Sequence, residues 1–265
     1  MTLSRRHLLR TALGLPILAV LPLRAHAEAL DIAAAINKAG RQRMLSQRIA
    51  KAYAQLVLGV YPDRARPILD KSVALFDSQL AELKAFAPTP AIRAQYAQLG
   101  ELWLPYRNAT QGVPSQAGLK QIAELNEGVL KTAHAATVAL EKHAGTATAH
   151  LVNIAGRERM LSQRSAKFYL FRAAGLDNTT VDQGLAMARH EFETGLAELK
   201  AAPQDTAEIK SQLLLAASQW AFFANALNHY TPDAPNPVHL QYVAASSEYV
   251  LEVMDVATGL YQSLH

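Results

Sequence analysis

The chain has 265 residues, half of them hydrophobic, with 25 glycines and prolines together and no cysteine. This composition excludes collagen-like and low-complexity proteins, disulfide scaffolds and sites that need a thiolate. The formal net charge is +4, but residues 1–27 hold four arginines and no acid. The rest of the chain has 22 basic and 22 acidic residues, so no general affinity for nucleic acid is expected.

The first predicted element is an export signal. Residues 4–10 read Ser-Arg-Arg-His-Leu-Leu-Arg, an apolar run extends from Thr11 to Leu23, and Ala25-His26-Ala27 has the pattern of a cleavage site. The apolar run would rise about 20 Å as a helix, which is too short for a hydrocarbon core of roughly 30 Å. We expect cleavage after Ala27 and a periplasmic protein. The arginine pair favours the twin-arginine route over the general secretion route. The alternative is a leader that stays uncleaved as a weak anchor.

The rest of the chain is a tandem repeat. Residues 36–53 (INKAGRQRMLSQRIAKAY) and 152–169 (VNIAGRERMLSQRSAKFY) are identical at 13 of 18 positions, with an offset of 116. Such self-similarity is the signature of a duplicated structural unit. The predicted parts are a signal peptide at 1–27, a first copy at 28–145 and a second copy at 146–265.

Apolar residues recur at helical spacing in both copies, and prolines divide each copy into four segments. The predicted helices are 30–59, 64–86, 91–110, 116–143, 147–174, 180–201, 206–229 and 238–263. The fold class is therefore all-α, with two tandem up-down-up-down four-helix bundles. Because no proline lies between residues 115 and 202, the sequence also allows a near-continuous helix that joins the bundles.

The repeated motif places an arginine inside an apolar stripe of the first helix of each copy. Arg43 shares its helix face with Ala39 and Ala50, and residues 32–62 contain no acid that would neutralise it. A guanidinium in such a place is costly unless it is paired. We therefore expect the two helices to meet where Gly40 permits close approach, with Arg43 and Arg159 converging on one small oxyanion. The candidate ligand-binding residues are Arg43, Arg159, Gly40, Gly156, Asn37, Asn153, Gln47 and Gln163.

The other bases of the motif have a simpler interpretation. Arg41, Arg48 and Lys51 are expected to be solvated or to pair with acids such as Glu82, Glu124 or Glu127 on other helices. No carboxylate–histidine motif of a di-iron bundle, phosphate loop or nucleophile elbow is present in the sequence. No metal, cofactor or catalytic residue is therefore predicted, and the protein is not expected to be an enzyme.

The pattern N-x-A-G-x-x-R-M-x-x-x-R spans Asn37–Arg48 and again Asn153–Arg164. It resembles the PilJ/NarX-type sensor domain of type IV pilus chemotaxis transducers and nitrate/nitrite sensor kinases. The resemblance implies a periplasmic helical bundle that binds nitrate or nitrite across a dimer axis. The arginine before the methionine, here Arg43 and Arg159, would contact the anion. In this chain the dimer axis would lie between the two copies. Since the sequence shows no membrane helix or output region, the resemblance implies a binding or sensing protein without its own output.

Three functions remain open. The first is a soluble periplasmic protein that binds one nitrate or nitrite between the repeats and serves a membrane receptor, transporter or reductase. The alternative is a structural or interaction module of a periplasmic signalling or pilus-related assembly, in which the motif packs helices and its arginines pair with acids. An enzyme or metal carrier is a third possibility, supported by the twin-arginine leader, because that route often exports proteins already loaded with a cofactor.

Overall fold

The computed structural model describes residues 31–229 and 236–264, and the regular structure in this part of the chain is helical throughout. The helices are α1 (Ile32–Val57), α2 (Pro62–Phe86), α3 (Pro90–Ala109), α4 (Gln116–Ala144), α5 (Ala147–Ala173), α6 (Asn178–Lys200), α7 (Ala207–Asn228) and α8 (Pro237–Gln262). Each begins and ends within two residues of its predicted bounds, so the all-α prediction is confirmed. None of these helices is long and apolar enough to cross a membrane. The predicted export signal, residues 1–27, lies outside the described residues.

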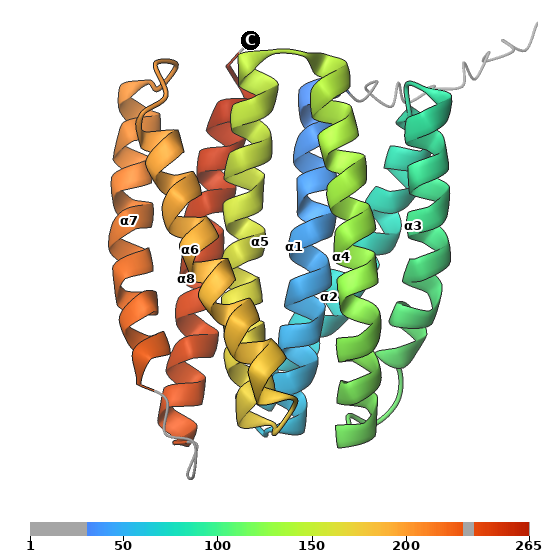
Figure 1. Cartoon of the computed structure of the whole chain (residues 1–265), viewed down its shortest axis with the longest axis vertical. Coiled ribbons are helices and arrows are strands. Elements are labelled where there is room, and N and C mark those ends of the chain that lie inside the picture. The colour runs from blue at the N-terminus through green and yellow to red at the C-terminus, as the bar shows by residue number, and fades with distance from the viewer. Residues whose placement is uncertain (1–30, 230–235, 265) are drawn as a thin grey trace, which may run out of the picture.

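The helices of each copy form an up-down-up-down bundle (Figure 1). Within the first bundle α1 packs on α2 and α4, and within the second α5 packs on α6 and α8. The bundles stand side by side, with α1 and α5 at the centre and running in the same direction. The most extensive contact between the copies is α1 against α5, so the repeated motif lies at the interface of the two halves.

The junction between α4 and α5 departs from one expectation. Gly145 ends α4 in the left-handed conformation with φ of 65°, and the Thr146 side chain caps α5 by accepting a 3.1 Å hydrogen bond from the backbone N–H of Ala149. The chain therefore reverses, and α4 and α5 run antiparallel (Figure 1). The possibility of a near-continuous helix from α4 into α5 is therefore wrong. A glycine C-cap followed by a threonine N-cap ends a helix without proline.

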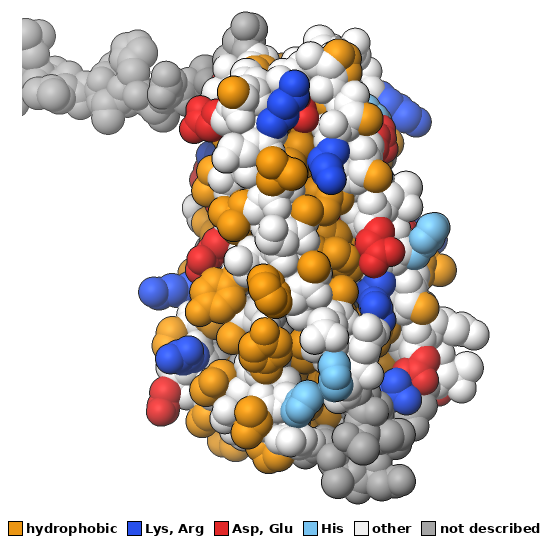
Figure 2. All heavy atoms as spheres, turned by 90° about the vertical axis from the view of Figure 1, so that its left-hand side faces the viewer, with side chains coloured by type: hydrophobic (Ala, Val, Ile, Leu, Met, Phe, Trp, Pro, Cys, Tyr) orange, Lys and Arg blue, Asp and Glu red, His pale blue; other side chains and the backbone are white. Residues whose placement is uncertain are grey.

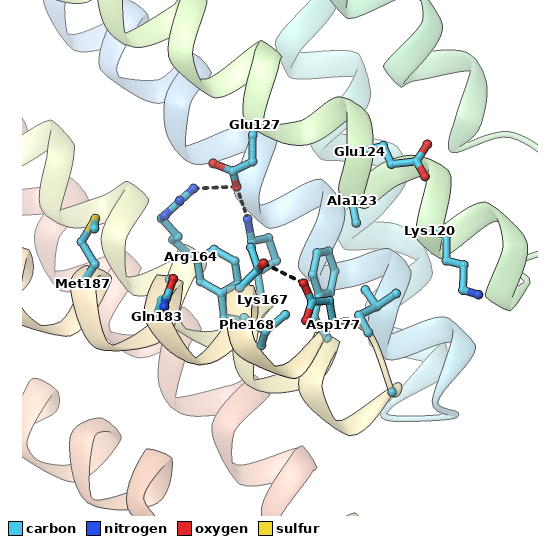
Figure 3. A pocket seen from close by; sticks show the side chains of 16 residues that line it. Lys120, Ala123, Glu124, Glu127, Arg164, Lys167, Phe168, Asp177, Gln183 and Met187 are labelled. Atoms are coloured by element: carbon cyan, nitrogen blue, oxygen red, sulfur yellow. Dashed lines mark hydrogen bonds and ion pairs between the residues drawn. The ribbon is translucent and has the colours of Figure 1, made fainter.

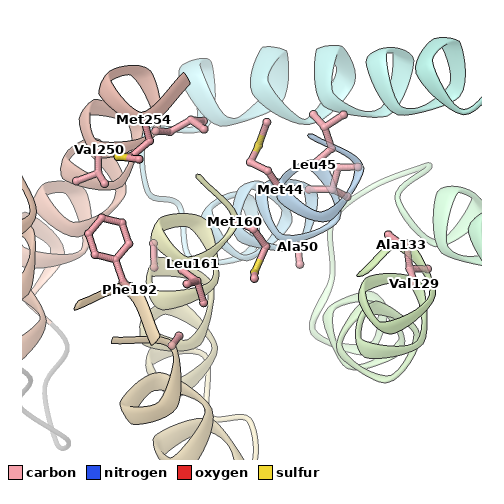
Figure 4. Close-up of a cluster of buried hydrophobic side chains, with 14 of the residues drawn as sticks. Met44, Leu45, Ala50, Val129, Ala133, Met160, Leu161, Phe192, Val250 and Met254 are labelled. Atoms are coloured by element: carbon pink, nitrogen blue, oxygen red, sulfur yellow. The ribbon is translucent and has the colours of Figure 1, made fainter. Parts of the chain in front are cut away.

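The central helices are buried on nearly every face. An ideal Cβ placed on Gly40 would lie 3.6 Å from Cα of Gly156, and the reverse distance is 3.7 Å, so the two backbones meet at these glycines. Small residues at this level allow α1 and α5 to approach closely, while α2, α4, α6 and α8 cover their remaining faces. Figure 4 shows part of the apolar core, with side chains from α1, α4, α5, α6 and α8.

The duplication is also visible in the outer core. Phe76 stacks on Trp103 with ring centroids 3.8 Å apart, and Phe192 stacks on Trp220 at 3.7 Å. Both pairs join the second helix of a bundle to the third. The same stacked aromatic contact therefore stabilises this helix pair in each copy.

The outer surfaces of the copies differ. Leu214, Leu215 and Phe222 on α7 are exposed, and hydrophobic side chains gather on the face of the molecule where α7 is the outermost helix (Figure 2). The charged residues of α7 are Glu208 and Lys210, both in its first turn, so the remainder of the helix is uncharged; in α3 the charged residues Arg93, Glu101 and Arg107 are spread along the helix. The two copies have therefore diverged in surface chemistry while keeping one fold.

Candidate functional site

The site is built where α1 and α5 cross at the paired glycines. The side chains of Arg43 and Arg159 are both completely buried there. Arg43 Nη2 donates to the backbone oxygen of Asn153 at 3.0 Å, and Arg159 Nη2 donates to the backbone oxygen of Asn37 at 3.2 Å. Because helical side chains lean toward the helix N-terminus, each arginine reaches back one turn to the opposite helix. The structure thus brings these four predicted residues together.

The glycines explain how two guanidinium groups fit into the interface. A Cβ on Gly40 would lie 3.2 Å from Arg43 Nη2, and a Cβ on Gly156 would lie 3.1 Å from Arg159 Nη2. These distances are tighter than ordinary contacts, so a side chain at either position would push on the guanidinium groups. The glycines make room for the arginines as well as for the neighbouring helix.

The two predicted glutamines lie one turn further along and are engaged with other helices. Gln47 Nε2 donates to Asn126 Oδ1 of α4 at 3.0 Å, and Gln163 Nε2 donates to the backbone oxygen of Ser247 of α8 at 2.8 Å. Both glutamines are fully buried. In this structure they attach the fourth helix of each bundle to its first helix.

A feature that the motif search missed is a matching stripe of polar residues on α4 and α8. Its members recur every seven residues, which keeps them on one helix face, and each pair is offset by 121. The pairs are Glu127 with Glu248, His134 with Asp255, and Glu141 with Gln262. Glu127 and Glu248 are identical residues at equivalent positions of the two copies. The other two pairs of the stripe differ in residue type, so comparison of the two copies does not reveal them.

The first level of the stripe locks the two halves together. Arg48 and Lys51 of α1 both form ion pairs with Glu248 of the second half. Burial alone would raise the pKa of Glu248, but Lys51 and Arg48 lower it to about 2. The alternative interpretation of these bases, pairing with an acid on another helix, holds for Arg48 and Lys51, although the partner is not one of the acids named from the sequence.

The second half repeats this arrangement in reverse. Arg164 and Lys167 of α5 each lie 2.8 Å from Glu127 Oε1 of the first half. The pairing is reciprocal, because each half contributes two cations to the acid of the other. These bases of the motif therefore serve the interface between the copies.

The second level of the stripe breaks the symmetry. Arg159 Nη1 forms an ion pair with Asp255, whose Oδ1 also accepts from Arg41 Nη2 at 3.0 Å. In the first copy, the equivalent group of Arg43 instead contacts Nδ1 of His134, at 3.2 Å. Since a guanidinium can only donate, this Nδ1 must accept, which leaves the imidazole proton on Nε2.

The charge state of His134 makes the difference between the copies larger. Partial burial of the ring, followed by the positive charges of Arg43 and Arg157, lowers the pKa of His134 to about 4. At neutral pH the histidine is therefore uncharged and cannot neutralise or repel Arg43. Within the described residues, no carboxylate lies within ion-pair distance of Arg43.

Burial and neighbouring cations act on both arginines, but unequally. Burial, then the charges of Arg159 and Arg157, lowers the pKa of Arg43 to about 9. Burial lowers the pKa of Arg159 to about 10, with Asp255 opposing the change. Both arginines stay charged at neutral pH, and the Nε of each lacks a hydrogen-bond partner. Arg43 is thus a buried cation whose positive charge the described residues do not neutralise directly.

A cavity of about 210 Å³ lies on the outer side of His134, between α4, α5 and α6. Its polar lining comprises His134, Lys131, Arg157, Arg164, Glu127 and Glu191. Arg157 pairs with Glu191 at 2.9 Å, so three cations and an imidazole N–H stand against two carboxylates. The size and the positive balance of this cavity suit a small anion.

The described part of the chain holds no group of three or more histidine, aspartate or glutamate side chains that could bind a metal ion. The geometry of the site consists of guanidinium groups, an imidazole and backbone carbonyls. These groups can form hydrogen bonds to a charged group.

The sequence profile of the N-terminal domain of type IV pili methyl-accepting chemotaxis transducers (PilJ) matches residues 25–127 and again 144–245. The chain belongs to this family. Its two matches coincide with the two copies of the repeat, so the chain carries two PilJ domains in tandem. The comparison with curated proteins and that with solved structures find no match.

Membership gives the protein its class. PilJ domains are non-catalytic, typically periplasmic sensor domains of chemotaxis and pilus signalling. The resemblance stated from the motif is thus confirmed for the pilus-transducer domain. Its nitrate-sensor part, the signal peptide and the twin-arginine route stay predictions.

Proposed function

We propose that this tandem PilJ protein is a periplasmic sensing component that binds one small oxyanion between its repeats, beside Arg43. The observation that carries the proposal is the unequal pairing of two equivalent arginines. Arg159 has Asp255 as an internal counter-ion, whereas Arg43 faces the neutral His134. A buried cation without a counter-ion is destabilising, and an anion from solution would remove that penalty.

The groove next to His134 supplies the remaining contacts. Arg157 lines this groove and offers a planar set of donors. His134 uses Nδ1 for its contact with Arg43, so its Nε2–H can donate to a ligand. Arg159 adds positive charge near Arg43. Among the neighbouring charges, it has the largest effect on the pKa of Arg43. The proposal therefore keeps one anion per chain but places it at the Arg43 end of the arginine pair.

Nitrate and nitrite are the first ligands to test. Both are small and carry their charge on a planar set of oxygens that matches the donors of a guanidinium group. In the proposed role the ligand-bound protein acts on a membrane receptor, transporter or reductase, and export by the twin-arginine route delivers it to the periplasm.

The test is calorimetric titration of the protein with nitrate and nitrite, with chloride and sulfate for comparison. Arg43→Met is expected to abolish binding while keeping the fold. Arg107→Met is the control, since it removes the same charge from a partly exposed arginine that lies near Asp77 in the outer part of the first bundle. Saturable binding with one site per chain supports the proposal. It is overturned if neither anion gives heat or thermal stabilisation, or if Arg43→Met binds as well as the wild type.

A second candidate is an interaction module without a small ligand. The observation that favours it is the reciprocal pairing of motif bases with Glu127 and Glu248, which shows that part of the motif serves packing. The same titration separates the candidates, because a packing module gives no heat with any of the four anions.

A further inference from the structure

A second and larger cavity, of about 650 Å³, lies between α4, α5 and α6 (Figure 3). Its volume falls in the range of pockets that hold small organic molecules, roughly 300–1,000 Å³. It is too large to be filled by an ion such as nitrate, so the anion proposed beside Arg43 does not explain it. The inference below is independent of that proposal.

One wall of the cavity is apolar and aromatic. Phe168 and Phe171 of α5 contribute their rings, and Leu176, Val181 and Met187 continue the apolar lining toward α6. Gly184 makes the position of Phe168 possible, because any Cβ at that position would overlap the ring. The wall offers a flat apolar surface for the body of an organic ligand.

One end of the cavity is cationic. Figure 3 shows Arg164, Lys167 and Glu127 gathered there, with both bases on one carboxylate. The Lys167 ammonium is almost completely buried and lies 4.0 Å from the centre of the Phe168 ring. Two basic groups share one acid at this end, while Lys120, Glu124 and Asp177 line other parts of the cavity (Figure 3).

Donors remain available at this end. The ammonium of Lys167 has three protons, and its two oxygen partners are Asn126 Oδ1 at 2.9 Å and Glu127 Oε1 at 2.8 Å. The bonds that Arg164 makes to Gln47 and Glu127 both start from Nη1. Burial lowers the pKa of Lys167 to about 7 against the opposing effect of Glu127, so a carboxylate bound beside it would favour its protonated form.

The first copy provides an internal comparison. There Glu248, the acid shared by Lys51 and Arg48, lines a cavity of only about 190 Å³, and neither base is part of its lining. At the offset of 116, Ala52 replaces Phe168, Gln55 replaces Phe171 and Ile68 replaces Gly184. The large cavity and the two phenylalanines that line it therefore have no counterpart at the equivalent positions of the first copy.

We propose that this cavity binds a small organic carboxylate with an apolar or aromatic body, held with its carboxylate at Lys167 and Arg164 and its body on Phe168 and Phe171. The ligand's carboxylate accepts hydrogen bonds from the two basic groups, which it shares with Glu127. Its body removes apolar surface of both partners from water, which is the main source of affinity.

The test is calorimetric titration with 3-phenylpropanoate. The uncharged analogue 3-phenylpropanamide and the cationic analogue 3-phenylpropylamine are titrated in parallel. The carboxylate is expected to bind with one site per chain and at least tenfold more tightly than either analogue. Lys167→Met is expected to weaken binding at least tenfold, while Lys51→Met, the same change at the equivalent position of the first copy, leaves it unchanged.

Thermal unfolding of both variants checks that they fold. If Lys167→Met does not fold, Met187→Glu replaces it, because Met187 is exposed at the rim and an added negative charge there also repels a carboxylate. The proposal is overturned if 3-phenylpropanoate binds more weakly than about 1 mM, if the amide or amine binds equally well, or if Lys51→Met has the same effect as Lys167→Met. Because Arg164, Glu127 and Met187 line both cavities, nitrate binding is tested separately, with Arg43→Met.

Discussion

The unequal pairing of the two central arginines predicts that one substitution will stabilise the protein. His134→Asp gives Arg43 the counter-ion that Asp255 gives Arg159. The geometry permits this, since the two positions are equivalent on α4 and α8 and each faces the Nη1 of its arginine. We expect the new carboxylate to form the same ion pair.

The size of the effect follows from the pair in the second copy. A buried hydrogen bond to a charged group stabilises a protein by about 1.5–3 kcal/mol. The side chain of Asp255 is 44% exposed, so solvent screening reduces the expected gain to about 1–2 kcal/mol. For a protein of this size each kcal/mol raises the Tm by about 2–4 °C, which gives an increase of about 2–8 °C at neutral pH.

The assay is thermal unfolding of wild type and His134→Asp at pH 7 and pH 3. The basic groups around Asp255 lower its pKa, against the opposing effect of burial, and the new aspartate should behave alike. A carboxyl with a lowered folded-state pKa stabilises above its unfolded pKa of about 3.9, and this stabilisation is lost as pH falls below that value. An unchanged or lower Tm at pH 7 would refute the reasoning. At pH 3 the wild type is itself destabilised by protonation of His134, whose folded-state pKa is about 4, so the loss of the aspartate's contribution at that pH is measured against His134→Asn. The reverse change, Asp255→His, should lower the Tm by a similar amount.

Two further substitutions test the interface of the halves and the buried acid beside it. Glu158 is fully buried, burial raises its pKa well above the usual range, and Gln42 occupies the equivalent position. A raised folded-state pKa makes the wild type lose stability as pH rises above about 4.3. Glu158→Gln should therefore unfold at a higher temperature than the wild type at pH 8 and at the same temperature at pH 4. No difference at pH 8 would be inconsistent with a buried, uncompensated acid. Gly156→Val should lower the free energy of unfolding, measured in urea, by about 1–3 kcal/mol, because the added side chain would overpack against Arg159. Gly128→Val is the control and should be neutral, because nothing lies within 4 Å of a Cβ at that position. Equal effects would argue against close approach of the central helices.

The sequence predicted the helices well because their signals are local. Prolines, capping residues and apolar spacing act within one or two turns, and all eight predicted helices are present within the described residues. The error at Gly145 has a local cause too. A proline is not the only signal for a helix end: the Gly145-Thr146 pair, a C-cap followed by an N-cap, ends α4 and begins α5 without one.

The site was only partly predictable, for a different reason. The motif placed Arg43 and Arg159 at the interface because the repeat and the apolar stripe are written within one helix. The partners of these arginines come from α4 and α8, some 90 residues away in the chain. Nothing in the local pattern distinguishes His134 from Asp255 as a partner. The asymmetry becomes visible only when the bundles place both residues at the same level.

The most direct test of the account is a crystal structure of the protein with bound nitrate or nitrite. The account predicts density for one planar anion per chain in the groove between α4, α5 and α6, within hydrogen-bond distance of His134 Nε2 or Arg157 and next to Arg43. A saturated crystal with this groove empty, or with the anion beside Arg159 and Asp255 instead, would contradict it.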